Sequence, residues 1–188
     1  MRITTILGSP RRHGNTAAVL EQFETLAAGN ATVRRINICD LQISGCRGCD
    51  ACQSRAGGPN CIQKDDLNQV LITVIASDLV VYAAPVYVWD FPAQMKMLMD
   101  RHYCLTKTRV AGGTSYLLEG KRVALLSTCG GPSEDNADLL RLIFRREMAF
   151  LHCRVEGEYV VGGCTTPSDL GDRARELGCQ MAHALLKT

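Results

Sequence analysis

The sequence lacks three features that would place it in large functional classes. Basic residues are not in excess, since 21 Lys and Arg stand against 19 Asp and Glu, and this argues against a nucleic-acid partner. The longest apolar run, Leu79 to Trp89, contains Pro85 and is shorter than the roughly 20 residues of a membrane-spanning helix. Only five residues, Ile3 to Leu7, stand between Met1-Arg2 and Gly8, too few for the apolar part of a signal peptide. We therefore expect a cytoplasmic protein with no nucleic-acid or membrane partner.

Catalytic signatures of hydrolases are also missing, because no Ser-His-Asp order, HExxH motif or paired-carboxylate motif stands out. No catalytic acid or base can be assigned from the sequence. The ten cysteines are about 5% of the chain, fewer than a disulfide-stabilised secreted scaffold contains, so we expect reduced thiols. Six cysteines are scattered, and five of them are expected to be small core residues: Cys39, Cys104, Cys153, Cys164 and Cys179. Cys129 is the exception, because its loop follows the fourth strand and should face a bound ligand.

What the sequence does contain is a regular alternation of strand and helix patterns. Strands are expected at 3–7, 33–38, 79–84, 122–127 and 155–161, and helices at 15–23, 66–76, 93–103, 135–150 and 168–186. Such alternation predicts an α/β fold, a three-layer sandwich around a five-stranded parallel sheet of order 2-1-3-4-5. The strand at 79–84 is continuously apolar and should lie at the centre. We expect one domain over 1–188, with a cysteine-rich loop inserted at 39–65.

A sheet of this kind binds ligands at the carboxyl ends of its strands, so the loops there carry the functional prediction. The loop after the first strand combines glycines, short polar side chains and a following helix, which is typical of an anion site. It matches neither a P-loop nor G-x-G-x-x-G, which leaves a phosphate monoester. The alternative is an ordinary turn capped by Asn15. The candidate binding residues are Ser9, Arg11, Gly14, Asn15 and Thr16.

The loop after the third strand is unusually apolar for a loop, and a flat aromatic ligand lying against it would explain this. The alternative is that Tyr87, Trp89 and Phe91 pack on helices or across a subunit interface. Small residues after the fourth strand could admit the other edge of such a ligand. The candidates in these two loops are Pro85, Val86, Tyr87, Val88, Trp89, Thr128, Cys129, Gly130 and Gly131.

These motifs resemble one known family. The segments that carry the resemblance are Gly8-Ser9-Pro10-Arg11 with Gly14-Asn15-Thr16, and Pro85-Val86-Tyr87 followed by Pro92, Met95-Lys96 and Asp100-Arg101. They are similar to the NADPH-dependent FMN reductases and their iron–sulfur flavoprotein relatives, of flavodoxin-like fold. The resemblance extends from Met1 to about Gly131. It implies that Ser9, Arg11, Asn15 and Thr16 hold the FMN phosphate, that residues 85–89 line the isoalloxazine, and that residues 128–131 close over the ring.

The resemblance also implies a function. The leading hypothesis is an FMN-dependent NAD(P)H oxidoreductase that passes electrons to a small acceptor such as free flavin, quinone or an iron species. The alternative is an iron–sulfur flavoprotein that transfers electrons between a ferredoxin-like partner and FMN. A third hypothesis is a thiol-based redox sensor.

Four cysteines gather in one segment, Cys46, Cys49, Cys52 and Cys61, with spacers of two, two and eight residues. This segment resembles the compact motif by which iron–sulfur flavoproteins hold a [4Fe-4S] cluster, and two-residue spacers are typical of cluster ligands. The last spacer is longer than the family motif usually allows, and no proline follows Cys61. Three states stay open: a cluster, a zinc ion, or free or redox-active thiols.

The apolar residues around the loop after the third strand predict oligomerisation. Trp89, Phe91, Met95, Met97 and Met99 carry more apolar surface than one strand-to-helix junction normally exposes. A second copy of the chain could cover this surface, so we expect a homodimer or a larger assembly.

Overall fold

A computed structural model describes residues 1–187 of the chain. Five parallel strands form the central sheet: β1 (Arg2–Leu7), β2 (Thr32–Asn37), β3 (Leu79–Pro85), β6 (Arg122–Thr128) and β7 (Arg154–Val161). Their order is β2-β1-β3-β6-β7. Counted in chain order, the arrangement is 2-1-3-4-5, and the predicted fold class is confirmed.

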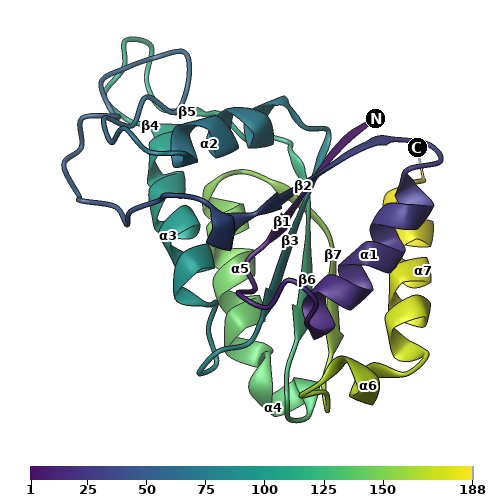
Figure 1. Cartoon of the computed structure of the whole chain (residues 1–188). Helices are drawn as coiled ribbons and strands as arrows, with labels where there is room; N and C mark the ends of the chain where they lie inside the picture. Colours follow the sequence, from purple (N-terminus) through teal and green to yellow (C-terminus); the bar gives the residue numbers. More distant parts are fainter. Residues whose placement is uncertain (188) are drawn as a thin grey trace.

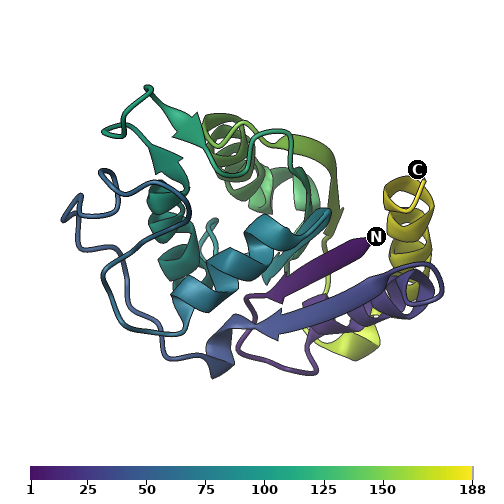
Figure 2. The ribbon, with the colours of Figure 1, turned by 90° about the horizontal axis from the view of Figure 1, so that it is seen from above.

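Helices cover both faces of the sheet and give the molecule three layers (Figures 1 and 2). One face carries α1 (Asn15–Ala27), α7 (Arg173–Leu185) and the short α6 (Pro167–Leu170). The other face carries α2 (Leu67–Ala76), α3 (Ala93–Arg101) and α5 (Asp138–Phe150), and the short α4 (Ser133–Asn136) leads into α5. Two 3₁₀ turns, η1 (Ile38–Asp40) and η2 (His102–Leu105), follow β2 and α3.

Strand β3 lies at the centre of the sheet because both of its faces are apolar. Val80, Tyr82 and Ala84 pack against α2, α3 and α5, whereas Leu79, Val81 and Ala83 pack against α1 and α7. These six side chains are completely buried. The continuous apolar run in the sequence therefore reports a strand covered by helices on both sides.

The helical boundaries differ from the expected ones at three places. The last helix is two helices, separated at Gly171, whose φ of +51° is a left-handed conformation that favours glycine. The helix after β3 ends at Arg101 and continues as η2, and Ala137 separates α4 from α5. The segment 106–120, expected to be a polar loop, contains a hairpin of β4 (Thr106–Lys107) and β5 (Ser115–Tyr116). Strands of two residues are too short to leave a pattern in the sequence.

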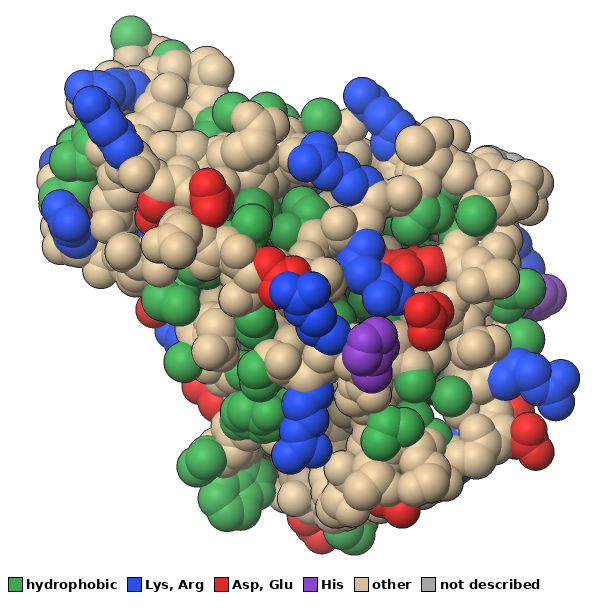
Figure 3. All heavy atoms as spheres, in the orientation of Figure 1, with side chains coloured by type: hydrophobic (Ala, Val, Ile, Leu, Met, Phe, Trp, Pro, Cys, Tyr) green, Lys and Arg blue, Asp and Glu red, His purple; other side chains and the backbone are tan. Residues whose placement is uncertain are grey.

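The apolar residues that suggested oligomerisation are mostly internal. Phe91, Met95 and Met99 are buried in the core of a single chain, so they provide no surface for a partner. Six of the exposed large apolar side chains lie instead on the β3–α3 loop and on α5: Tyr87, Val88, Trp89, Leu139, Leu142 and Phe150. Figure 3 shows hydrophobic side chains protruding at the lower left, where the β3–α3 loop lies. Within residues 1–187, no helix has the length and apolar character needed to cross a membrane.

The scattered cysteines occupy mixed environments. Cys104 and Cys164 are buried, as expected of small core residues, and Cys39 and Cys153 are half-buried. Cys129, which was expected to face a ligand, is also buried. Cys179 differs from the expectation, because it lies exposed on α7.

Candidate functional site

A cavity of about 240 Å³ lies at the carboxyl ends of β1, β3 and β6, where the strand order reverses. The structure brings together most of the predicted binding residues in its lining: Ser9, Arg11, Gly14, Asn15, Thr16, Pro85, Val86, Tyr87, Thr128, Cys129 and Gly130. Val88, Trp89 and Gly131, which were also predicted, are not part of this lining. Cys164 and Thr165 complete it and were not predicted.

The loop after β1 presents polar groups and backbone N–H groups to the cavity. Ser9 is buried, and its hydroxyl accepts a hydrogen bond from the Arg11 backbone N–H at 3.1 Å. Helix α1 begins at Asn15 without a side-chain cap, so its first-turn N–H groups remain available to an anion. Gly8 is required at the start of the loop, because a Cβ there would lie 2.8 Å from Met95 Cβ on α3. The loop after β1 and the first turn of α1 therefore form one wall of the cavity.

Asn15 joins two sides of the cavity. Its side-chain N–H donates to the Cys164 carbonyl oxygen at 2.9 Å, while its Oδ1 is buried without a hydrogen-bond partner among the described residues. The next residue, Thr16, shares a hydrogen bond of 2.7 Å with the Thr128 hydroxyl on β6. An unpartnered buried acceptor is costly, by roughly 1–3 kcal/mol, so Asn15 indicates that a donor from a ligand belongs there.

The β3–α3 loop turns back on itself within four residues. The Tyr87 N–H donates to the Asp90 carbonyl at 2.9 Å, and the Asp90 N–H donates to the Tyr87 carbonyl at 3.1 Å. The two central residues, Val88 and Trp89, have φ of +51° and +62°. This conformation is rare for a β-branched residue and costs of the order of 1–3 kcal/mol.

Neighbouring elements hold this strained turn in place. The Val86 N–H donates to the Thr128 carbonyl at 2.9 Å, and the Trp89 indole N–H donates to the Asp135 carbonyl on α4 at 3.2 Å. Val88 remains 85% exposed at the tip. The turn thus carries Tyr87 into the cavity lining while its tip points to solvent.

Two buried thiols, Cys129 and Cys164, lie on the side of the cavity formed by β6 and β7. Burial is the main cause that raises the pKa of both thiols. The nearby Glu134 carboxylate also raises the pKa of Cys129, and the nearby Asp169 carboxylate also raises the pKa of Cys164. The Cys164 N–H donates to the Cys129 carbonyl at 3.1 Å, which fastens the two loops together. Both side chains are therefore neutral at physiological pH and form a polarisable, uncharged wall.

The loop after β7 was missed by sequence reasoning. Asp169 organises it, because its carboxylate accepts backbone N–H bonds from Thr165 at 2.7 Å and Thr166 at 2.8 Å. These bonds, the one from Thr166 first, lower the pKa of Asp169 to about 2. The Arg11 guanidinium donates to the Thr165 carbonyl at 3.4 Å. The glycine pair 162–163 was the only signal in the sequence that the chain turns here toward the cavity.

The four clustered cysteines line a second, small cavity. Cys46 and Cys49 are exposed, Cys61 is half-buried and Cys52 is buried, yet all four border the same space. Arg101 from α3 also borders it, with Tyr103 and Cys104 from η2. In Figure 1 this loop lies at the upper left, whereas the carboxyl ends of the strands lie at the bottom. The two cavities therefore occupy different parts of the molecule.

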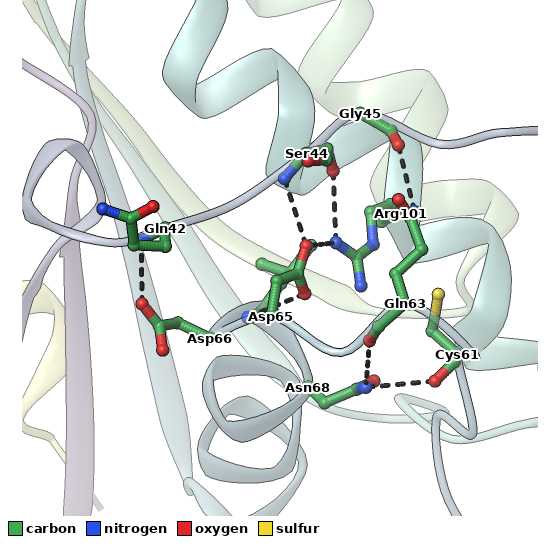
Figure 4. Close-up of polar contacts among 10 residues, drawn as sticks. Gln42, Ser44, Gly45, Cys61, Gln63, Asp65, Asp66, Asn68 and Arg101 are labelled. Atoms are coloured by element: carbon green, nitrogen blue, oxygen red, sulfur yellow. Dashed lines mark hydrogen bonds and ion pairs between the residues drawn. The ribbon is translucent and has the colours of Figure 1, made fainter.

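A polar network holds the two ends of the cysteine loop, which we define as residues 44–65 (Figure 4). The Arg101 guanidinium donates through Nη1 to the Ser44 carbonyl at 3.1 Å and to the Asp65 carboxylate. The Gln63 side chain donates to the Gly45 carbonyl at 3.0 Å, and the Asn68 side chain donates to the Cys61 carbonyl at 3.0 Å. Hydrogen bonds therefore fix the segment just before Cys46, the first cysteine of the loop, and the segment that starts at Cys61, the last one.

The β4–β5 hairpin covers the middle of the cysteine loop. The buried Lys107 ammonium donates to the Cys52 carbonyl at 3.0 Å and the Pro59 carbonyl at 2.8 Å. Gln53 is also buried, and its side-chain amide oxygen Oε1 accepts a hydrogen bond from the Thr108 N–H at 3.1 Å. The unpredicted hairpin is therefore the element that positions the loop.

The cysteine side chains do not converge on a single point. Over residues 1–187, no group of three or more His, Cys, Asp or Glu side chains is placed to hold one metal ion. All ten cysteines are free thiols. In a [4Fe-4S] cluster each thiolate binds a different iron atom, so its four ligands surround a larger volume than the ligands of a single ion.

Comparison with known proteins identifies the family. Residues 1–161 match the family model of the NADPH-dependent FMN reductases. The chain belongs to this family. It is accordingly an FMN-dependent oxidoreductase that uses NAD(P)H, and the resemblance noted in the sequence is confirmed.

Named relatives cover most of the chain. An iron–sulfur flavoprotein from Archaeoglobus fulgidus is 29% identical over 98% of this chain and 80% of its own length. An iron–sulfur flavoprotein from Methanosarcina thermophila is 30% identical over 69% of this chain and 64% of its own length. Among solved structures, an FMN-dependent NADH-azoreductase from Bacillus anthracis in complex with FMN has a TM-score of 0.75 at 15% identity, with complete coverage of both chains. At that identity, the structural likeness supports the flavodoxin-like fold alone.

Proposed function

We propose that the cavity at the strand ends binds FMN and that the chain uses NAD(P)H to reduce a small acceptor such as free flavin, a quinone or an iron species. The observation that carries this proposal is the convergence of four loops on one cavity, with an uncapped helix N-terminus on one side and Tyr87 on the other. A phosphate fits the first side and a flat ring fits the second.

Different groups of lining residues match the phosphate, the ribityl chain and the ring of FMN. Ser9, Arg11 and the first turn of α1 would hold the phosphate, because they supply N–H and O–H donors and a positive charge. The unpartnered Oδ1 of Asn15 would accept a hydrogen bond from a ribityl hydroxyl. Residues 85–87 and 128–130 would lie along the ring.

Bound FMN would supply the redox chemistry, accepting a hydride from the nicotinamide and passing the electrons to the acceptor. The chain would contribute orientation and exclusion of water. Cys129 and Cys164 are neutral, so they would leave the ring region without a formal charge. The exposed tip at Val88 and Trp89 lies outside the lining and leaves the cavity mouth open to a substrate.

The experiment that tests this proposal is the affinity for FMN of Arg11→Ala compared with Arg12→Ala. Arg12 is a matched control, because it pairs with Asp40 at 2.8 Å and does not line the cavity. Loss of one charge-assisted bond costs about 1.5–3 kcal/mol, so Arg11→Ala should weaken FMN binding by roughly one to two decades. Unchanged affinity in Arg11→Ala, or preference for FAD over FMN, would contradict the assignment.

A second function is favoured by the cysteine loop. We infer that the chain also acts in electron transfer between FMN and a ferredoxin-like partner, through a [4Fe-4S] cluster held by Cys46, Cys49, Cys52 and Cys61. Two observations support it: the four thiols border one cavity, and the relatives that cover most of the chain are named iron–sulfur flavoproteins. Iron, acid-labile sulfide and FMN per chain, measured on anaerobically purified protein, distinguish a cluster from zinc or free thiols.

We further propose that the chain forms a homodimer or a larger assembly. Six exposed apolar side chains lie on the β3–α3 loop and α5, and a second copy would remove them from water. Sedimentation at tens of micromolar that shows only monomer would contradict this proposal.

A further inference from the structure

Arg101 is a buried cation whose hydrogen-bonding capacity is only partly used. It ends α3, its side chain is 1% exposed, and its Nη1 binds the Ser44 carbonyl and the Asp65 carboxylate. Its Nε and Nη2 are buried without a partner among the described residues. A buried charged group is destabilised when two of its donors have no acceptor. The donors therefore indicate a missing acceptor.

The place of that acceptor is defined by the cavity. Arg101 borders the same space as Cys46, Cys49, Cys52 and Cys61. Figure 4 shows the Cys61 side chain on the side of the network that carries the guanidinium. An acceptor that satisfies Nε and Nη2 from within this space would be a sulfur atom of a thiolate or of an inorganic sulfide.

A second buried cation lies against the middle of the cysteine loop. Lys107 is 1% exposed, and its ammonium is bound by two carbonyl oxygens, one of them that of Cys52. Within the described part of the chain, no ion pair joins Lys107 to a carboxylate, whereas Arg101 has Asp65. Two buried cations against one carboxylate leave an excess positive charge beside the thiols. Such an excess destabilises the loop unless anionic ligands compensate it.

We propose that Arg101 is a positioning residue of the iron–sulfur site, donating hydrogen bonds through Nε and Nη2 to cluster sulfur and, with Lys107, compensating the negative charge of four thiolates. This inference rests on the second of the functions proposed above. When such a cluster takes up one electron its ligands stay the same and its charge becomes more negative by one unit. Positive charge and N–H donors near the sulfur atoms favour that reduced state, so Arg101 raises the reduction potential.

Three variants test this role. Arg101→Gln removes the charge and keeps a polar side chain, whereas Asp65→Asn removes the opposing carboxylate and keeps a near-identical shape. Arg55→Gln is the matched control, because Arg55 is an exposed arginine of the same loop that does not border the cavity. Each protein is purified anaerobically, assayed for iron, acid-labile sulfide and FMN per chain, and titrated with dithionite in the presence of redox mediators.

We expect opposite shifts. Arg101→Gln should lower the ratio of reduced to oxidised cluster at a fixed potential by about tenfold, which is about 59 mV for one electron, or lose iron while it retains FMN. Asp65→Asn should shift the potential upward, and Arg55→Gln should leave it unchanged. The Asp65 variant keeps the test decisive if Arg101→Gln does not fold.

Two results would overturn the proposal. One is wild-type iron content and wild-type potential in both Arg101→Gln and Asp65→Asn. The other is wild-type protein that contains FMN and no iron, in which case the cavity holds no cluster. That second result leaves the FMN-dependent reduction of a small acceptor intact, so failure of this inference and failure of that function are distinguishable.

Discussion

The cavity at the strand ends and the cavity in the cysteine loop are built in different ways. The first is formed by short loops that leave adjacent parallel strands, and its polar groups are mainly backbone N–H groups and small side chains. The second lies outside the sheet, and residues distant in sequence form it, since Arg101 meets Ser44 and Lys107 meets Cys52. One site follows from the topology of the sheet, whereas the other depends on a few long-range contacts made by buried cations.

Because of this difference, substitutions should affect the two cavities differently. The strand-end cavity rests on the central sheet, so its shape should persist when a side chain in one loop is changed. The cysteine cavity has its ends and its middle held by separate side chains, so loss of one contact should affect the whole loop. The following experiments test that contrast, from the largest expected effect to the smallest.

Cys49→Ser should separate the two sites most completely. Cys49 is exposed, so its replacement costs no core packing, but it removes one of four thiolate ligands. We expect iron and acid-labile sulfide to fall nearly to zero while FMN per chain stays at the wild-type level. Cys179→Ser, at another exposed cysteine on α7, is the control and should retain iron. Iron-free protein whose NAD(P)H oxidation collapses on Cys49→Ser would point to a catalytic or regulatory thiol instead.

The two cavities should also differ in thiol reactivity. In protein freed of cofactors, alkylation near neutral pH should label the exposed Cys46 and Cys49 at least about tenfold faster than Cys129 and Cys164. Burial raises the pKa of the last two, so little thiolate is present below their pKa, and labelling should accelerate as the pH rises through it. Mass spectrometry after timed alkylation measures each site. Equal rates at all four positions would contradict the assigned burial.

Trp89→Ser should weaken the self-association that we propose. Trp89 is 53% exposed beside the strand-end cavity, and removing a large aromatic side chain from an interface typically costs enough to raise the dissociation constant about tenfold or more. Leu26→Ser, at an exposed apolar position on α1, should have no effect. Sedimentation velocity over a range of concentrations measures both. A shift that is the same in the two variants would show that the β3–α3 loop is not the interface.

Val88→Asn should have the smallest effect, and it should be stabilising. The turn requires positive φ at Val88, a conformation that asparagine adopts more readily, and the exposed valine loses no packing. We expect the free energy of unfolding to rise by about 1 kcal/mol in urea titration. Val155→Asn, in the extended strand β7, should give no such gain. A decrease in stability at Val88 would show that the strained turn depends on the valine side chain.

The sequence by itself determined the sheet and the loops at its carboxyl ends. Residues such as Gly8, Asn15 and Pro85 act within a few positions of a strand end, and parallel pairing then brings these ends to one edge. Local pattern and topology were therefore enough to predict most of the first cavity.

Only the tertiary structure decided the remaining features. The loop after β7, the β4–β5 hairpin and the place of Arg101 beside the cysteines depend on contacts between residues far apart in the chain. The same holds for Phe91 and Met95, which the sequence pattern suggested were surface residues and which are buried in the core. Periodicity reports which face of an element is apolar, but it does not report which neighbour covers that face. The charge environment of the cysteine loop is decided by such neighbours, because burial and pairing arise only when the chain has folded.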